Sequence, residues 1–116
     1  MTTIQLPSYL KMYRKRTGLT HEEVAFLLGS MSGASVSRHE NGARLPILRT
    51  ALKYQAIFGQ ALCELYPGIF DEARELVRKR ARGLRLSLEK RPRNAVRDRK
   101  IEILTGIIGE EVDKAA

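Results

Sequence analysis

Apolar residues recur at the spacing of a helix along most of this 116-residue chain, and no stretch alternates apolar and polar residues as a half-buried strand does. The pattern therefore predicts an all-α fold. The first helix is expected to follow Pro7 and to end at Gly18. It has Leu6, Leu10 and Tyr13 on one face and basic residues on the others.

The second helix has the clearest start in the chain. Thr20 and Glu23 have the spacing of a capping box, and Leu19 can pack against Val24 as a hydrophobic staple. Gly29 can adopt the left-handed conformation that closes a helix. A helix between Thr20 and Gly29 is therefore expected.

The third helix follows after a few small residues. Either Ser30 or Ser32 can cap its start, and Ser32 is preferred because Val36 and His39 then lie three residues apart on the inner face. The Asn-Gly pair that begins at Asn41 predicts its end. Two short helices joined by a small-residue turn are typical of the helix-turn-helix that enters a DNA groove.

Two more helices are expected in the first half of the chain. One begins near Leu48 and ends at Phe58, before Gly59, and a short one runs from Leu62 to Leu65. The buried stripe expected on the longer helix consists of Leu48, Ala51, Leu52, Gln55, Ile57 and Phe58. The tyrosines expected in the core, rather than as stacking platforms, are Tyr9, Tyr13 and Tyr54.

The remainder of the chain differs in charge. Residues 71–100 contain 12 Lys or Arg against 5 Asp or Glu, whereas residues 101–116 contain one Lys against 4 acids. A long helix is expected here because Phe70, Val77 and Leu84 recur every seven residues, although Gly83 weakens it by about 1 kcal/mol. After a break at residues 91–94, a last helix capped by Asn94 is expected to bury Ile101, Leu104, Ile108 and Val112.

Each of these two C-terminal helices has an apolar stripe that needs a surface to cover it. The five helices before them already form a compact unit, so a partner chain is the economical answer. We expect a DNA-binding domain over residues 1–68 and a basic helical extension over residues 69–116 that forms a homodimer or binds another protein. The residues expected at the dimer contact are Phe70, Val77, Leu84, Leu88, Ile101, Leu104 and Ile108.

Overall charge and composition narrow the class of protein. Lys and Arg number 21 against 13 Asp and Glu, a net charge of +8, which is the sign expected of a protein that meets phosphate backbones. Basic membrane-surface and ribosome-associated proteins share this sign. The single Cys63 excludes a disulfide framework and a cysteine zinc cluster, and it suits a reducing cytosol. Without a recognisable membrane span or signal peptide, the protein is expected in the cytoplasm, at the nucleoid.

Two segments resemble a known family. YRKRTGLTHEEVAFLLG and SVSRHENGARLP are similar to the Cro and lambda-repressor type helix-turn-helix regulators, the XRE family, over about residues 6–66. The matching positions are Gly18-Leu19-Thr20, Glu23, Leu28-Gly29, Ser37-Arg38, Glu40-Asn41-Gly42 and Pro46. The resemblance implies a five-helix lambda-repressor-like DNA-binding domain and an ion pair between Arg14 and Glu40.

The resemblance also implies contacts with double-stranded DNA. His21 would bind a phosphate while it braces the recognition helix, and Asn41 would meet another phosphate. The base-reading positions of the family fall on Gly33, Ala34, Ser37 and Arg38. The turn before this helix is one residue longer than is usual, and two of these positions lack the long amide side chains often found in the family.

Arg38 is the best candidate for reading a base. Its planar guanidinium can donate twice to a guanine, which is worth about 1 to 3 kcal/mol against a wrong base; contact with a phosphate or with solvent is the competing interpretation. Ala34 can touch a thymine methyl group, and Arg44 is placed to bind a backbone phosphate. The full set of candidate DNA-binding residues is Thr20, His21, Ser32, Gly33, Ala34, Ser35, Ser37, Arg38, Asn41 and Arg44.

Catalysis and metal binding have little support. His21 and His39 are the two histidines of the chain, they lie 18 residues apart, and neither belongs to a cluster at ligand spacing. No nucleophile elbow, phosphate-binding glycine loop or pair of catalytic carboxylates is recognisable. We therefore expect no enzyme activity, cofactor or metal, and place His39 at the inner edge of the recognition helix.

The function predicted from sequence is that of a sequence-specific transcriptional regulator, a repressor that binds a two-fold operator as a homodimer. The alternative is an antitoxin-like or protein-interaction module whose residues 71–116 bind another protein, with DNA binding secondary. The Arg-rich residues 74–100 have three interpretations: the solvated side of a dimerising helix, a further DNA-backbone contact, or an RNA-binding segment.

Overall fold

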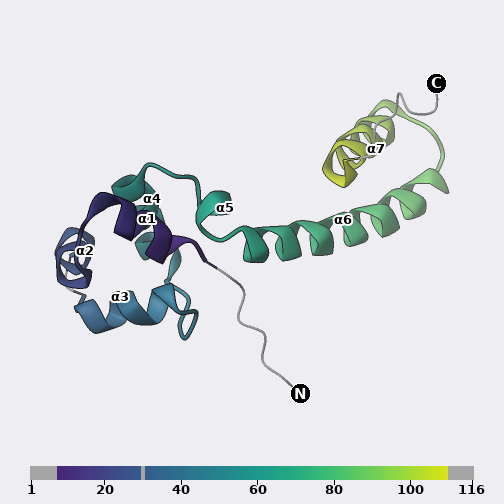
Figure 1. Ribbon diagram of the computed structural model, residues 1–116. Helices are drawn as coiled ribbons and strands as arrows, with labels where there is room; N and C mark the ends of the chain where they lie inside the picture. Colours follow the sequence, from purple (N-terminus) through teal and green to yellow (C-terminus); the bar gives the residue numbers. More distant parts are fainter. Residues whose placement is uncertain (1–7, 30, 110–116) are drawn as a thin grey trace, which may run out of the picture. The chain divides into compact units, whose positions relative to one another are not determined.

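The computed structural model describes residues 8–29 and 31–109, and these residues form seven α-helices and no strands (Figure 1). The helices are α1 (Leu10–Thr17), α2 (His21–Leu28), α3 (Gly33–Glu40), α4 (Leu48–Phe58), α5 (Leu62–Leu65), α6 (Pro67–Glu89) and α7 (Ala95–Ile108). The prediction of an all-helical chain is confirmed for this part of it. The chain divides into two compact units, Met1–Asp71 and Glu72–Ala116.

Capping interactions set the ends of the first helices. At the start of α2, the Thr20 hydroxyl accepts a hydrogen bond from the Glu23 amide at 3.1 Å, and the Glu23 carboxylate accepts one from the Thr20 amide at 2.9 Å. The predicted capping box is therefore confirmed. Ser32 is the N-cap of α3, because its hydroxyl accepts from the Ser35 amide at 3.3 Å. Ser30, the alternative cap, lies outside the described residues.

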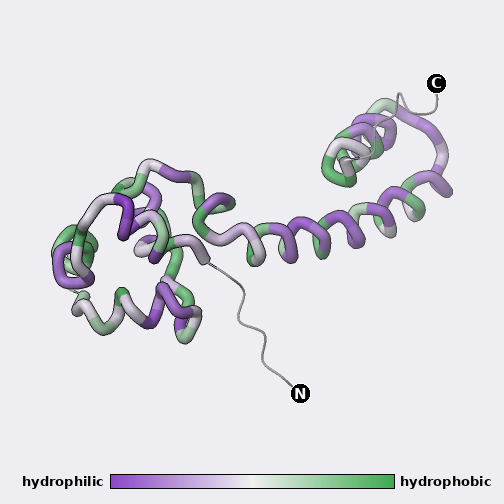
Figure 2. The backbone as a smooth tube through the Cα atoms, viewed as in Figure 1, coloured by the Kyte–Doolittle hydropathy of each residue, from purple (hydrophilic) through white to green (hydrophobic). Residues whose placement is uncertain are grey.

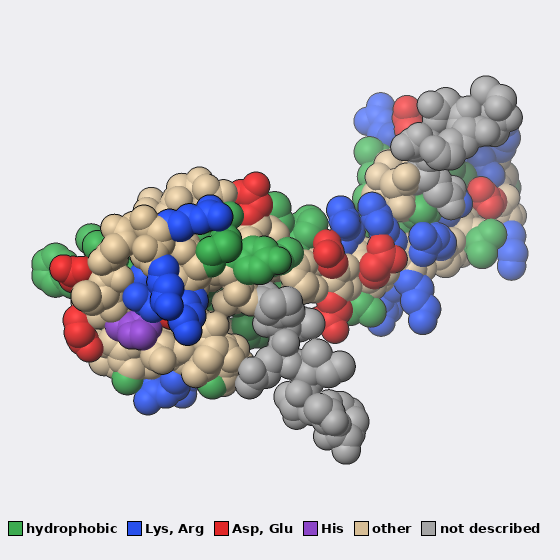
Figure 3. Space-filling view, viewed as in Figure 1, with side chains coloured by type: hydrophobic (Ala, Val, Ile, Leu, Met, Phe, Trp, Pro, Cys, Tyr) green, Lys and Arg blue, Asp and Glu red, His purple; other side chains and the backbone are tan. Residues whose placement is uncertain are grey.

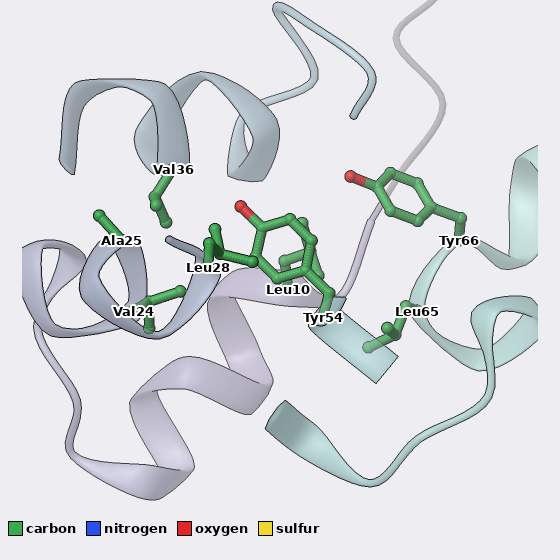
Figure 4. Packing of buried hydrophobic residues seen from close by; sticks show 8 residues of the cluster. All are labelled: Leu10, Val24, Ala25, Leu28, Val36, Tyr54, Leu65 and Tyr66. Atoms are coloured by element: carbon green, nitrogen blue, oxygen red, sulfur yellow. The ribbon is translucent and has the colours of Figure 1, made fainter. Parts of the chain in front are cut away.

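The core of the first unit lies among α1 to α5. Figure 4 shows side chains from all of these helices pointing into one cluster, which consists of Leu10, Val24, Ala25, Leu28, Val36, Tyr54, Leu65 and Tyr66. Burial of these aliphatic and aromatic side chains is the main stabilising contribution in a unit of this size. The cluster holds α2 and α3 against α4, which supports the two helices from behind.

The inner face of α4 differs from the predicted stripe. Its buried residues are Thr50 and Tyr54, whereas Leu48 is 70% exposed and Leu52 is 48% exposed. The side of α4 that faces the core carries Thr50 and Tyr54 and continues through Ile57 and Phe58. Tyr54 belongs to the core cluster itself. The expectation that Tyr54 lies in the core is confirmed, but Tyr9, also expected there, is 44% exposed.

The second unit has a core of its own, between α6 and α7. Leu88 of α6 and Leu104 and Ile108 of α7 are buried together with Ala81, and Ile101 packs against them. Hydrogen bonds link the antiparallel helices. Arg97 donates from Nε to the Leu88 carbonyl at 3.1 Å and from Nη2 to the Glu89 carbonyl at 3.2 Å, and Arg85 Nη1 donates to Thr105 Oγ1 at 3.2 Å. Val112, also predicted to be buried, lies outside the described residues.

This packing corrects part of the expected dimer contact. Leu88, Ile101, Leu104 and Ile108 were assigned to a partner chain, but α7 folds back on α6 and covers these side chains within one chain. The other three residues are exposed: Phe70 by 44%, Val77 by 53% and Leu84 by 53%. Figure 2 shows hydrophilic and hydrophobic segments alternating along α6, as expected of a helix with one apolar stripe. Among the helices that the structure describes, none has the length and apolar character needed to cross a membrane.

Candidate nucleic-acid interface

The turn between α2 and α3 depends on Gly29. Its φ of +113° is a conformation that residues with a side chain rarely adopt, and its amide bonds back to the carbonyls of Ala25 and Phe26 at 3.1 and 3.2 Å. Lys53 of α4 donates to the carbonyl of Leu28 at 2.8 Å. The end of α2 is thereby fastened to the helix behind it, and α3 starts from a fixed point.

Gly33, at the start of α3, lies buried against α2. A Cβ atom at this position would overlap the carboxylate of Glu22 and would lie 3.2 Å from the Cβ of His21. A side chain here would force the Glu22 carboxylate to move and would press against His21, so glycine favours the close approach of the two helices. The prediction that Gly33 reads a base is corrected, since this position packs against protein.

A charged cluster holds α1, α2 and α3 together. Arg14 of α1 donates from Nε and Nη2 to the two carboxylate oxygens of Glu40 at 2.5 and 3.1 Å, and from Nη1 to the carbonyl of Leu19 at 3.1 Å. Nε2 of His21 lies 3.1 Å from the Glu40 carboxylate. The hydrogen bond to Glu40 is the largest effect on the pKa of Arg14 and raises it, although burial acts in the opposite direction. The ion pair implied by the family resemblance is thus present, and the His21 ring contacts the same carboxylate.

The outer face of α3 is polar. Ala34, Arg38 and Asn41 are exposed, while Ser35 and Ser37 are half-buried at the edges of the helix. Val36 and His39 point the other way, into the core. Every residue of the outer face is either small or able to donate hydrogen bonds, which is what a helix needs to approach base edges in the major groove.

The segment after α3 is held close to that face. The amides of Ala43 and Arg44 both bond to the carbonyl of Arg38, at 3.0 and 3.3 Å, and the side-chain oxygen of Asn41 accepts from the Ala43 amide at 2.9 Å. Arg44 is exposed next to this turn. The exposed side chains of Arg38 and Arg44 and the side-chain nitrogen of Asn41 can therefore donate hydrogen bonds at the end of α3 and in the turn after it.

Behind α3 lies a polar contact that the sequence did not reveal. Nδ1 of the buried His39 is 2.8 Å from the hydroxyl of Tyr54, and the two rings meet edge to face. Burial, and then the charges of Arg44 and Arg38, lower the pKa of His39; burial likewise raises the pKa of Tyr54. Both groups are therefore neutral at neutral pH. No periodic signal in the sequence connects these two positions.

The remaining surface is basic in both units, with Lys and Arg side chains widespread on the face shown in Figure 3. Among the residues that the structure describes, no three His, Cys, Asp or Glu side chains gather as metal ligands. The geometry can bind an anionic polymer along an exposed helix.

One comparison with known proteins agrees with this geometry. Neither the curated proteins nor the solved structures gave a match. A family model described as a helix-turn-helix domain matches residues 5–66, which include the described parts of α1 to α5. Since that match covers more than half of the chain, the protein belongs to the helix-turn-helix domain family, whose fold indicates DNA binding and a role in transcription regulation.

Proposed function

We propose that this protein is a sequence-specific transcriptional regulator of the XRE type, with a lambda-repressor-like first unit that places α3 in the major groove of duplex DNA. It acts by binding in the cytoplasm, at the nucleoid, and catalyses no reaction. The observation that carries the proposal is the outer face of α3. It consists of exposed small and polar residues on a helix braced from behind by the Arg14–Glu40 pair and by the His39–Tyr54 contact.

Arg38 is the residue that reads sequence. It is exposed at the centre of that face, and its neighbours Ala34 and Ser37 are small enough for the helix to come close to base edges. A guanidinium that donates to O6 and N7 of a guanine discriminates against other bases by about 1 to 3 kcal/mol. Ser35 and Ser37 add shorter contacts, so specificity depends strongly on one side chain.

Backbone contacts come from residues that flank this face. Thr20 and Ser32 are helix caps with exposed positions, and Asn41 and Arg44 follow the recognition helix. His21, half-buried beside Glu40, orients the helix while its ring edge meets a phosphate. Phosphate contacts of this kind fix register and make binding depend on salt.

A homodimer follows from the exposed apolar residues of the second unit. Val77 and Leu84 lie to one side of the buried row of α6, and Ile103 of α7 lies to the corresponding side of its own buried row. Because α6 and α7 are antiparallel, these rows share one side of the helix pair, where Val96 and Ile107 extend the apolar surface. A second copy covers this surface, and two-fold symmetry then sets half-sites about one helical turn apart. A bound dimer occludes its operator, so we propose repression.

The test of sequence reading is selection of bound duplexes from a random pool, followed by affinity measurements at several salt concentrations. Wild-type protein should enrich a two-fold motif. Arg38→Ala should lose the preference for one base pair of each half-site while keeping most of the salt-dependent affinity. The control is Arg38→Lys, which keeps the charge but lacks the planar fork. Equal preference in all three proteins would show that Arg38 binds only the backbone.

The dimer is tested by sedimentation equilibrium. Leu84→Lys should shift the protein toward monomer, whereas Leu86→Lys, at an exposed leucine on another side of α6, should not. If both variants remain dimeric, the proposed surface is not the dimer contact. If the wild-type chain is monomeric and binds all duplexes equally, the regulator proposal fails. A module that binds another protein through the same exposed apolar residues then becomes the better account.

A further inference from the structure

A cavity of about 340 Å³ lies beside the recognition helix, between the end of α2, the inner side of α3 and the first turn of α4. All of its lining residues belong to the first unit. Its volume is at the lower end of the range of small-molecule sites, which begins at about 300 Å³. The nature of its lining indicates the kind of molecule that fits.

Two buried polar side chains line this cavity with hydrogen-bonding capacity to spare. His39 is 2% exposed and Thr50 is 9% exposed. His39 uses Nδ1 for the Tyr54 hydroxyl, and within the described residues neither its Nε2 nor the Thr50 hydroxyl has a hydrogen-bond partner. Because burial raises the pKa of Tyr54, its phenol keeps its proton and can donate to Nδ1. In the tautomer in which the Tyr54 phenol donates to Nδ1, Nε2 of His39 carries the imidazole proton and is a donor on the cavity wall.

The rest of the polar lining is cationic. Arg44, Arg49 and Lys53 line the cavity, and none of its lining residues is acidic. The first turn of α4 adds amide groups that have no side-chain cap, because its N-cap residue is Ile47. One Lys53 hydrogen already bonds to the Leu28 carbonyl, which leaves two more for a ligand. A negatively charged group is favoured by every one of these features.

The other walls are apolar. Leu28, Met31 and Leu45 also line the cavity. An inorganic ion would leave this surface without a partner, whereas a molecule with a hydrocarbon body would cover it. The phosphodiester backbone of a DNA duplex can reach the exposed Arg44. It cannot enter the cavity far enough to contact the buried side chains of His39 and Thr50.

We propose that this cavity binds a small organic carboxylate, with its charged group on Thr50, His39 and Lys53 and its apolar body against Leu28 and Met31. The ligand regulates DNA binding, a step that rests on the proposed function. Its negative charge lies between the recognition helix and Arg44, where it neutralises a phosphate-binding arginine and repels the DNA backbone. The ligand therefore acts as an inducer that releases DNA.

Binding is tested first without DNA, by following the ring signals of the two histidines in NMR titrations of the full chain. The probes are benzoate and 3-methylbutanoate, with benzamide as a neutral analogue and inorganic phosphate as an ion without an apolar body. The carboxylates should shift the His39 signals with saturation. Thr50→Val and Lys53→Met should each weaken binding roughly tenfold, since each removes a hydrogen bond to a charged group.

Lys11→Met is the matched control, because it removes the same charge from an exposed site on α1. It should leave the affinity for the carboxylates unchanged. If neither carboxylate shifts His39, the proposal is wrong. If phosphate binds as well as benzoate, or if Lys11→Met weakens binding as much as Lys53→Met does, the site is only diffuse positive charge and the proposal also fails.

Regulation is tested separately, by measuring the affinity for the selected duplex with and without saturating benzoate. A loss of DNA affinity in wild-type protein that is absent in Thr50→Val supports the inducer role. A carboxylate that binds without changing DNA affinity overturns that role. If the protein binds no specific duplex at all, the proposed function fails, while the titrations without DNA still decide whether the cavity binds carboxylates.

Discussion

Removal of the Glu40 carboxylate should loosen the brace behind the recognition helix. The Glu40 side chain is 5% exposed and that of Arg14 is 11% exposed, so Glu40→Ala leaves a cation with two unused donors in a largely buried place. Hydrogen bonds to charged groups contribute about 1.5 kcal/mol each at the low end, which gives about 3 kcal/mol for the two. Breaking a buried ion pair costs a similar amount, about 3 to 5 kcal/mol. We expect Glu40→Ala to lower the free energy of unfolding by about 3 kcal/mol.

The chain offers a convenient signal for this measurement. It has no tryptophan, and its four tyrosines all lie in the first unit, so tyrosine fluorescence during urea denaturation reports on that unit alone. His21→Ala is an internal comparison. It removes one contact of the same carboxylate from a side chain that is 39% exposed, and it should cost no more than about 1 kcal/mol.

A double-mutant cycle with Arg14→Ala separates the pair from its surroundings. The coupling energy between Arg14 and Glu40 should be about 2 kcal/mol or more, because each single variant leaves the other charge without its partner. A coupling below about 0.5 kcal/mol would refute the reasoning. It would mean that solvent replaces the carboxylate easily and that the helices are held by apolar packing alone.

Three further effects are expected. Gly29→Ala should destabilise the first unit by about 1 to 2 kcal/mol in the same urea experiment, because φ is +113° there, and unchanged stability would contradict the geometry. Gly83→Ala should stabilise α6 by up to about 1 kcal/mol in thermal circular dichroism, since it lies in a helix with no atom within 4 Å of an added Cβ. Burial lowers the pKa of His39 in the folded protein. As the pH falls below about 6.5, this side chain is therefore protonated in the unfolded chain before it is protonated in the folded one. Stability should then decrease by at most about 1.4 kcal/mol per pH unit, and a His39→Leu variant should lack this loss.

The helices and their ends were largely determined by local sequence. The capping pair Thr20 and Glu23, the cap at Ser32 and the stop at Gly59 act on backbone groups within a few residues, so their effect can be predicted without knowing the fold. The same holds for the polar outer face of α3, because residues at helical spacing must share a side. The helix-turn-helix was therefore recognisable from the sequence.

Tertiary structure decided how these helices face one another. Leu48 and Leu52 are exposed on α4, whereas Thr50 and Tyr54 face inward. The space beside α3 accepts the Tyr54 hydroxyl, which meets His39, and no local pattern encodes that partner. Gly33 looked like a base-reading position until α2 was seen to occupy the space around it.

The C-terminal helices show the same division. Their apolar stripes were evident in the sequence, but which stripe residues are covered within the chain depends on how α7 folds back. Leu88 and Leu104 are buried in that way, while Val77 and Leu84 stay exposed. Periodicity identifies a face that must be buried; only the packing of distant elements in three dimensions determines what buries it.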